Sequence, residues 1–150
     1  MAPPTLRSGF GPLLSLTTRQ WRRAVDRRLQ PYGLTEATWL PLLRLSRAEA
    51  PMRQKDLAAS LGLDGSSVVR LLDNLEQAGL AERREEAGDR RAKTIHLTAA
   101  GEATVEKVER VSREVRARLL DEIADRDLQV ATRVLQRIAA ALESLDEAFA

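Results

Sequence analysis

The spacing of apolar residues predicts helices over most of the chain. The segments in which apolar side chains recur at helical spacing are 13–30, 35–45, 54–61 and 65–78. Pro31 ends the first segment, Thr35 occupies the N-cap position of the second, and Gly79 closes the fourth. Pro41 lies inside the second segment, where we expect it to kink or shorten the helix. Residues 1–12 contain three of the six prolines and predict a flexible arm.

Two shorter runs after the fourth helix favour extended structure. They cover residues 80–84 and 91–97, and a glycine-containing turn joins them. In the second run Lys93, Ile95 and Leu97 alternate with polar residues, as in a half-buried strand. The pattern therefore predicts a β-hairpin.

Two long helices complete the pattern. Their regularly spaced stripes are Val105, Val108, Ser112, Val115 and Leu119 in the first helix, and Leu128, Ala131, Leu135, Ile138, Leu142, Leu145 and Phe149 in the second. The second stripe keeps the three-four alternation of a coiled coil over about three heptads. We interpret the opening helix and these two helices as a shared dimer interface, while an intramolecular bundle is the alternative.

The central elements follow the order of a winged helix-turn-helix: a short helix, a glycine-containing turn, a second helix and a hairpin. The predicted fold class is mainly α (α+β), with a winged helix-turn-helix lobe and long N- and C-terminal dimerisation helices. This interpretation assigns residues 48–97 to the lobe, and residues 13–47 and 98–150 to the dimerisation region.

Composition excludes several classes of protein. The chain has 150 residues and no cysteine, which excludes disulfides, a zinc ribbon and a thiol switch. It shows no signal peptide and no apolar run long enough to span a membrane, so we expect a cytoplasmic protein. The single histidine, His96, would support an enzyme only if it were buried beside a carboxylate. We therefore expect no enzyme, no metal and no cofactor.

The polar face of the fourth helix is suited to a DNA major groove. Gly65, Ser66 and Ser67 at its start are small enough for close approach. Arg70 could donate two parallel N–H groups to guanine, and Asn74 could pair with adenine or hold a phosphate. The exposed amides at the helix start also suit phosphate. A solvated helix face with serine caps is the alternative.

The hairpin is rich in basic residues, namely Arg83, Arg84, Arg90, Arg91 and Lys93. An arginine on a protruding hairpin can enter a narrow minor groove, and Asp89 could hold such a side chain extended. Several glutamates share the segment, and the formal net charge of the whole chain is only +2. Charge alone is therefore weak support for an anionic partner, and a solvated surface is the alternative.

At these residues the sequence resembles the MarR family, and within it the SlyA branch. The run from Asp89 to Thr98, followed by Gly101, resembles the family's wing motif of Asp, any residue, Arg, then Leu-Thr and a later Gly. The other positions that resemble the SlyA branch are Trp21, Arg22, Asp26, Arg28, Leu29, Pro31, Leu34, Thr35 and Trp39, then residues 67–70, Leu72, Asp73, Leu75, Glu76, Gly79 and Leu80. The resemblance covers residues 13–98 by motif and the two final helices by pattern only.

The resemblance implies a homodimer with two winged lobes that binds palindromic promoter DNA. Such a regulator acts as a repressor, or else as an activator or counter-silencer. The resemblance gives base contacts to Ser66, Ser67 and Arg70, and wing contacts to Asp89, Arg90 and Arg91.

Many members of the family release DNA when a small aromatic acid binds between the dimerisation helices and the lobe. The resemblance places Arg19 and Trp39 near that crevice, with Thr35 adjacent and Arg22 nearby. An arginine beside an indole suits a carboxylate on a ring. The alternative is that Trp39 is simply part of the core.

A winged-helix adaptor that binds another protein is the remaining alternative. Such an adaptor has no need of arginines on both the fourth helix and the hairpin. Salt-sensitive binding to duplex DNA would separate the two functions.

Overall fold

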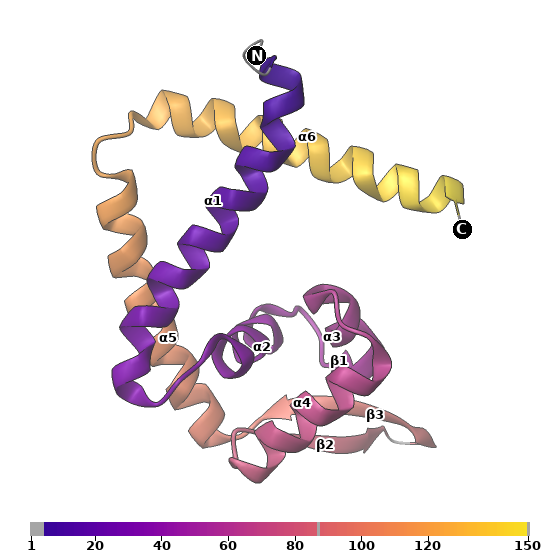
Figure 1. Cartoon of the computed structure of the whole chain (residues 1–150). Helices are drawn as coiled ribbons and strands as arrows, with labels where there is room; N and C mark the ends of the chain where they lie inside the picture. The colour runs from indigo at the N-terminus through magenta and orange to yellow at the C-terminus, as the bar shows by residue number, and fades with distance from the viewer. Residues whose placement is uncertain (1–4, 87, 150) are drawn as a thin grey trace. The chain divides into compact units, whose positions relative to one another are not determined.

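The computed structural model describes residues 5–86 and 88–149, and the side chains of residues 89–92 and 146–149 lie outside this description. The chain divides into two compact units, residues 1–115 and 116–150. The elements of the first unit are α1 (Leu6–Leu29), η1 (Gln30–Tyr32), α2 (Glu36–Arg47), β1 (Met52–Arg53), α3 (Gln54–Leu61), α4 (Gly65–Gln77), β2 (Ala81–Glu86), β3 (Asp89–Leu97) and most of α5 (Ala99–Leu120) (Figure 1). The second unit holds the end of α5 and α6 (Asp125–Phe149). These elements confirm the mainly helical α+β class and the winged helix-turn-helix lobe.

The core of the lobe is built around one face of α4. Val68, Leu72 and Leu75 of this helix are buried against Leu57 of α3 and Ile95 of β3. The remaining buried members of this cluster are Leu42, Ala58, Ala81 and Val105. Because the cluster uses the whole apolar face of α4, the opposite, polar face is left toward solvent.

A second cluster packs α1 and α2 against α5. Its buried members are Val25, Leu29, Leu34, Trp39, Leu43, Val108, Val111 and Val115. Trp39 is only 3% exposed, and its indole Nε1 donates a hydrogen bond to Asp26 Oδ1 at 3.2 Å. Trp39 is therefore a core residue whose polar atom has a partner, which is the alternative that the sequence left open.

The sheet has three antiparallel strands in the order β1-β3-β2. β2 and β3 form the predicted hairpin, with Arg83 opposite Ile95. β1 was not predicted, and it pairs Arg53 with Thr94 on the other side of β3. A segment of two residues carries no periodicity of its own, so only its partner strand makes it extended.

The predicted alternation along β3 is wrong at two positions. Lys93 is exposed, whereas Thr94 is buried at 7% exposure. Thr94 tolerates burial because its hydroxyl is within hydrogen-bonding distance of His96 Nε2, at 2.9 Å. Thr94 and Ile95 are consecutive and both buried, so side chains on both faces of β3 are buried at this point and a simple inside–outside pattern does not describe it.

Helix boundaries match the predictions best where local caps define them. α3 has the predicted bounds, and α4 ends within one residue of its predicted end. α1 begins at Leu6 rather than at residue 13, so the arm predicted over residues 1–12 is wrong from Leu6 onward. The Thr5 side chain caps this start by accepting a hydrogen bond from the Ser8 amide, and Pro12 is tolerated inside the helix. Pro41 likewise lies within α2, which continues to Arg47.

The end of the hairpin is joined directly to α5 at a tight junction. Thr98 Oγ1 donates to the Gly79 carbonyl at 2.5 Å and accepts from the Gly101 amide at 3.1 Å. The Thr98 amide donates to the Leu80 carbonyl at 3.2 Å. A Cβ at Gly101 would overlap that same carbonyl oxygen of Leu80. The Thr and Gly of the wing motif therefore fix where the hairpin and α5 meet α4.

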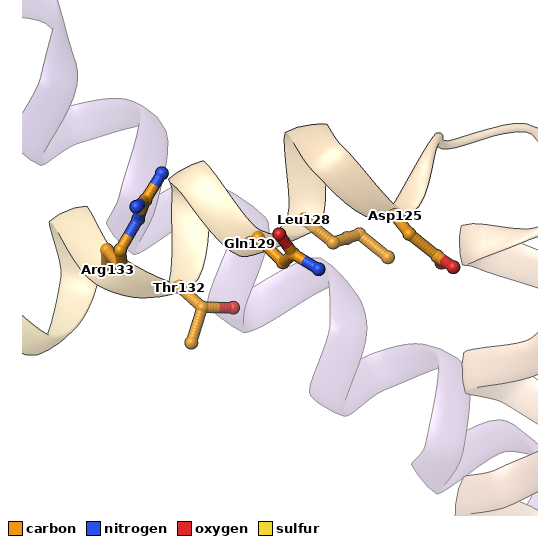
Figure 2. A pocket seen from close by; sticks show the side chains of 5 residues that line it. All are labelled: Asp125, Leu128, Gln129, Thr132 and Arg133. Carbon is orange, nitrogen blue, oxygen red and sulfur yellow. The ribbon is translucent and has the colours of Figure 1, made fainter.

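In the second unit, α6 exposes much of its apolar stripe. Leu142 and Leu145 are 55% and 52% exposed, and Leu135 is also exposed. A shallow hollow on this helix is lined by Asp125, Leu128, Gln129, Thr132 and Arg133, whose side chains all project from α6 (Figure 2). None of the helices in the described part of the chain combines the length and apolar character needed to cross a membrane.

The α5 stripe differs from the prediction at two positions. Val111 is buried where Ser112 was predicted, and Leu119 is 46% exposed. The inward face of α5 instead runs through Val105, Val108 and Val115, as predicted.

We predict that Gly101→Ala lowers the free energy of unfolding by about 1–3 kcal/mol, because the new methyl group must displace the Leu80 backbone. Gly65→Ala is the control, since a Cβ there meets nothing within 4 Å. Its effect should stay within about 0.5 kcal/mol. Denaturant unfolding of both variants at one protein concentration measures this, and equal stabilities would contradict the steric account.

Candidate nucleic-acid interface

The exposed face of α4 begins at a capped end. Asp64 is the N-cap, and its Oδ1 accepts from the Ser67 amide at 2.7 Å and from the Ser66 hydroxyl at 2.9 Å. The backbone hydrogen bond from Ser67 is the main cause that holds the pKa of Asp64 below its ordinary value. The Ser67 amide is therefore already used, and it is not free for phosphate as the sequence analysis expected. Ser66 remains exposed on this face.

Arg70 and Asn74 lie further along the same face, one turn apart and both exposed. No hydrogen bond or ion pair links the Arg70 guanidinium to the residues that the structure describes. Its five N–H donors are thus available to a ligand. The buried leucines on the other side of α4 fix this orientation, because rolling the helix would expose them.

A groove separates this face of α4 from the start of α2. Ser67, Arg70 and Asn74 line it on the α4 side, and Thr35 and Thr38 line it on the α2 side. The structure therefore brings three of the four predicted recognition-helix residues together at one concave surface. Thr38 also lines this groove and was not predicted. The sequence gives its position in α2 but not the direction of its side chain.

The basic residues of the hairpin differ in their surroundings. Arg83 forms ion pairs with Asp73 and Glu76 of α4, and Arg84 pairs with Glu82 on its own strand. Lys93 is exposed and lies opposite Glu85. The backbone of Asp89, Arg90 and Arg91 belongs to β3, but their side chains lie outside the described residues, and their wing role stays a prediction.

Arg83 and Glu76 shift each other's protonation in the expected sense. The hydrogen bond from the Arg83 side chain holds the pKa of the Glu76 carboxyl below its ordinary 4.5. The same contact, together with that to Asp73, raises the pKa of Arg83. Both groups are therefore charged at neutral pH.

The four residues predicted to bind an aromatic acid do not form one site. Arg19 is exposed on α1, Trp39 is buried in the second cluster, and Thr35 lines the α2–α4 groove. Arg22 lines a different, mostly apolar cleft and forms an ion pair with Glu36 at 3.6 Å. Glu36 also lines this cleft, together with Ala37, Leu40, Pro41, Leu61, Leu63 and Leu71.

The sequence contained only a weak signal for these cleft residues. These residues come from α1, α2, α3, α4 and the α3–α4 turn, and the pattern along the chain does not bring these segments together. The ring of His96 is half-buried and has Thr94 as its partner, so the arrangement that would have supported an enzyme is not what the structure describes around this residue.

The sequence profile of the MarR family matches residues 32–92, from η1 into β3. The transcriptional regulator PA3341 is 42% identical, the match covers 90% of this chain and 98% of that one, and the TM-score is 0.84. This chain belongs to the MarR family.

Two further MarR-like structures have been solved with ligands. S. aureus MepR, in a complex with DNA, is 25% identical, with 89% of this chain and 97% of that chain covered and a TM-score of 0.75. CouR from Rhodococcus jostii RHA1, bound to p-coumaroyl-CoA, is 28% identical, with 91% and 96% covered and a TM-score of 0.74. The family resemblance is thus confirmed for this MarR-family protein, whereas its SlyA branch stays a prediction.

Proposed function

We propose that this protein is a sequence-specific transcriptional regulator that binds double-stranded DNA. The observation that carries the proposal is Arg70, an unpaired guanidinium on the exposed face of a helix whose other face is locked in the core. The hairpin beside it supplies further basic residues for the flanking backbone or minor groove. A 42% identical transcriptional regulator and the DNA-bound MepR support this function.

The regulator acts as a homodimer on pseudo-palindromic promoter sites. The exposed stripe of α6 needs a partner surface, because leucines exposed at regular spacing along one helix face are typical of an interface. A two-fold dimer presents two copies of α4, which match half-sites about one helical turn, or about 34 Å, apart. Occupying a promoter in this way makes repression the primary role we propose.

A small aromatic carboxylate modulates DNA affinity by binding in the cleft beside Arg22. The cleft is mostly apolar, and Leu40, Leu63 and Leu71 suit an aromatic ring while Arg22 suits the carboxylate. CouR, which is bound to p-coumaroyl-CoA, supports an aromatic acyl ligand. Leu71 belongs to α4, so a ligand wedged here bears directly on the recognition helix.

We expect Arg70→Ala to weaken binding to a duplex selected from a random pool by about 1–3 kcal/mol and to relax preference at one base position. Replacing Arg90 and Arg91 should weaken binding to all duplexes by similar factors and reduce the salt dependence of that binding. Arg113→Ala, an exposed arginine of α5, is the control and should bind normally. Fluorescence anisotropy at several salt concentrations measures this, and unchanged affinity in all variants would rule out the proposed interface.

Leu142→Glu should raise the dimer dissociation constant about 100-fold or more, because a charge buried in an apolar interface costs several kcal/mol. Ser144→Glu introduces the same charge on a different side of α6 and should leave the dimer intact. Sedimentation velocity over a concentration series separates the two. A Leu142→Glu protein that remains dimeric at the wild-type concentration would show that this stripe is not the interface.

Salicylate-like acids should bind less tightly when the operator is present, by a factor of about 5–150, because linkage is reciprocal. Arg22→Gln should weaken binding of the acid. Arg19→Gln, which removes an exposed arginine of the same helix, should leave this binding unchanged. Calorimetric titrations with and without operator measure both effects. Equal acid affinity in the two titrations would mean that the cleft does not control DNA binding.

A further inference from the structure

Arg83 connects the middle of the hairpin to the recognition helix. Its amide donates to Glu76 Oε1 at 2.8 Å, and its Nε and Nη2 donate to Glu76 Oε2 at 3.1 and 2.6 Å. Nη2 also pairs with Asp73 Oδ1. The side chain is only 22% exposed, so little of the guanidinium remains for an outside ligand.

This contact differs from that of the neighbouring arginine. Arg84 is on the same strand and carries the same charge, but its partner Glu82 is also on β2, so their ion pair links nothing to α4. Asp73 and Glu76 are one turn apart on α4 and on the same side of it. Arg83 therefore bridges two elements, whereas Arg84 stays within one.

The position of this bridge determines what it restrains. The base of the hairpin is already held, because the Leu80 amide donates to the Leu75 carbonyl at 2.9 Å and Thr98 closes the junction. Arg83 lies further out, opposite Ile95, between that base and the tip. Charge-assisted hydrogen bonds from two guanidinium nitrogens there resist bending of the hairpin away from α4.

We propose that Arg83 is a positioning residue that holds the wing at a fixed angle to the recognition helix and does not itself contact DNA. This inference rests on the proposed DNA-binding function. Major-groove contacts from α4 and contacts from the wing, the hairpin of β2 and β3, must be made at the same time. The apparent affinity for DNA is therefore proportional to the fraction of molecules in which the wing is correctly placed. Arg83 thus acts through the geometry of other residues, unlike the wing contact that the sequence analysis predicted for it.

The decisive variant is Glu76→Gln. If Arg83 acts by position, loss of the Glu76 charge weakens operator binding about tenfold, even though it removes a negative charge from the DNA-facing helix. If only charge mattered, the same change would strengthen binding. Arg83→Gln should weaken binding to a similar extent without altering the slope of log affinity against log salt. Arg84→Gln, the matched control for charge, should have a smaller effect.

Two further measurements separate positioning from simple loss of stability. Circular dichroism at the assay temperature establishes that each variant is fully folded. In a background with Arg90 and Arg91 replaced by Ala, Arg83→Gln should have little further effect, because there is no wing contact left to position. The exchanged pair Arg83→Glu with Glu76→Arg should recover part of the lost affinity.

Several outcomes would overturn the inference. A Glu76→Gln protein that binds more tightly, or an Arg83→Gln protein whose salt slope falls by about one, identifies Arg83 as a phosphate contact. Wild-type affinity in folded Arg83→Gln excludes any role in binding. A wild-type protein that selects no duplex instead overturns the proposed function itself, so the two failures are distinguishable.

Discussion

Burial of one face of α4 is the constraint on which the rest of the lobe depends. Val68, Leu72 and Leu75 share one buried cluster with residues of α2, α3, β2, β3 and α5, and each leucine contributes about 1.5–3 kcal/mol by leaving water. The helix therefore cannot roll, and the direction in which Arg70 points is determined by the core rather than by local contacts. The exposed face of α4 is therefore held rigid by the core. It needs no hydrogen bonds of its own for this, so the Arg70 donors remain available to DNA.

The arginines of this protein are not equivalent, and their number says little about function. Those in ion pairs between described residues are Arg22, Arg28, Arg47, Arg53, Arg83, Arg84 and Arg126. Most of these pairs are exposed and add little stability. A ligand that uses one of these guanidinium groups must displace its carboxylate partner, as the aromatic acid proposed beside Arg22 must displace Glu36. Arg70 differs from them because Asp73, one turn further along α4, pairs with Arg83 instead. The position of an arginine and its partners, rather than net charge, distinguish a binding arginine from a structural one.

The sequence predicted those features that local chemistry determines. Gly62 and Gly79, both at positive φ, and the Asp64 cap define the ends of α3 and α4, so these helices were located correctly. β1 depends on β3, which is distant in the chain, and no local pattern contains it. The partners of Arg83 lie only seven and ten residues away, but on a different element, so the periodicity of neither element reveals them. The aromatic-acid residues were taken from the family resemblance, which does not reveal that Trp39 turns inward while Arg22 faces the cleft. The directions of side chains, more than the locations of helices, are what the sequence could not supply.

The Asp64 cap has a consequence for how such a protein would search a genome. Its carboxylate is held ionised at the start of α4, where it offsets the positive end of the helix dipole. In the proposed complex this charge repels phosphates of every sequence equally, while the gain from Arg70 arises only at the matching base. A charge that weakens all encounters by the same factor leaves the ratio of specific to non-specific affinity unchanged, but it shortens the residence time at each non-specific site. The residue that stabilises the helix would thereby also shorten each unsuccessful visit.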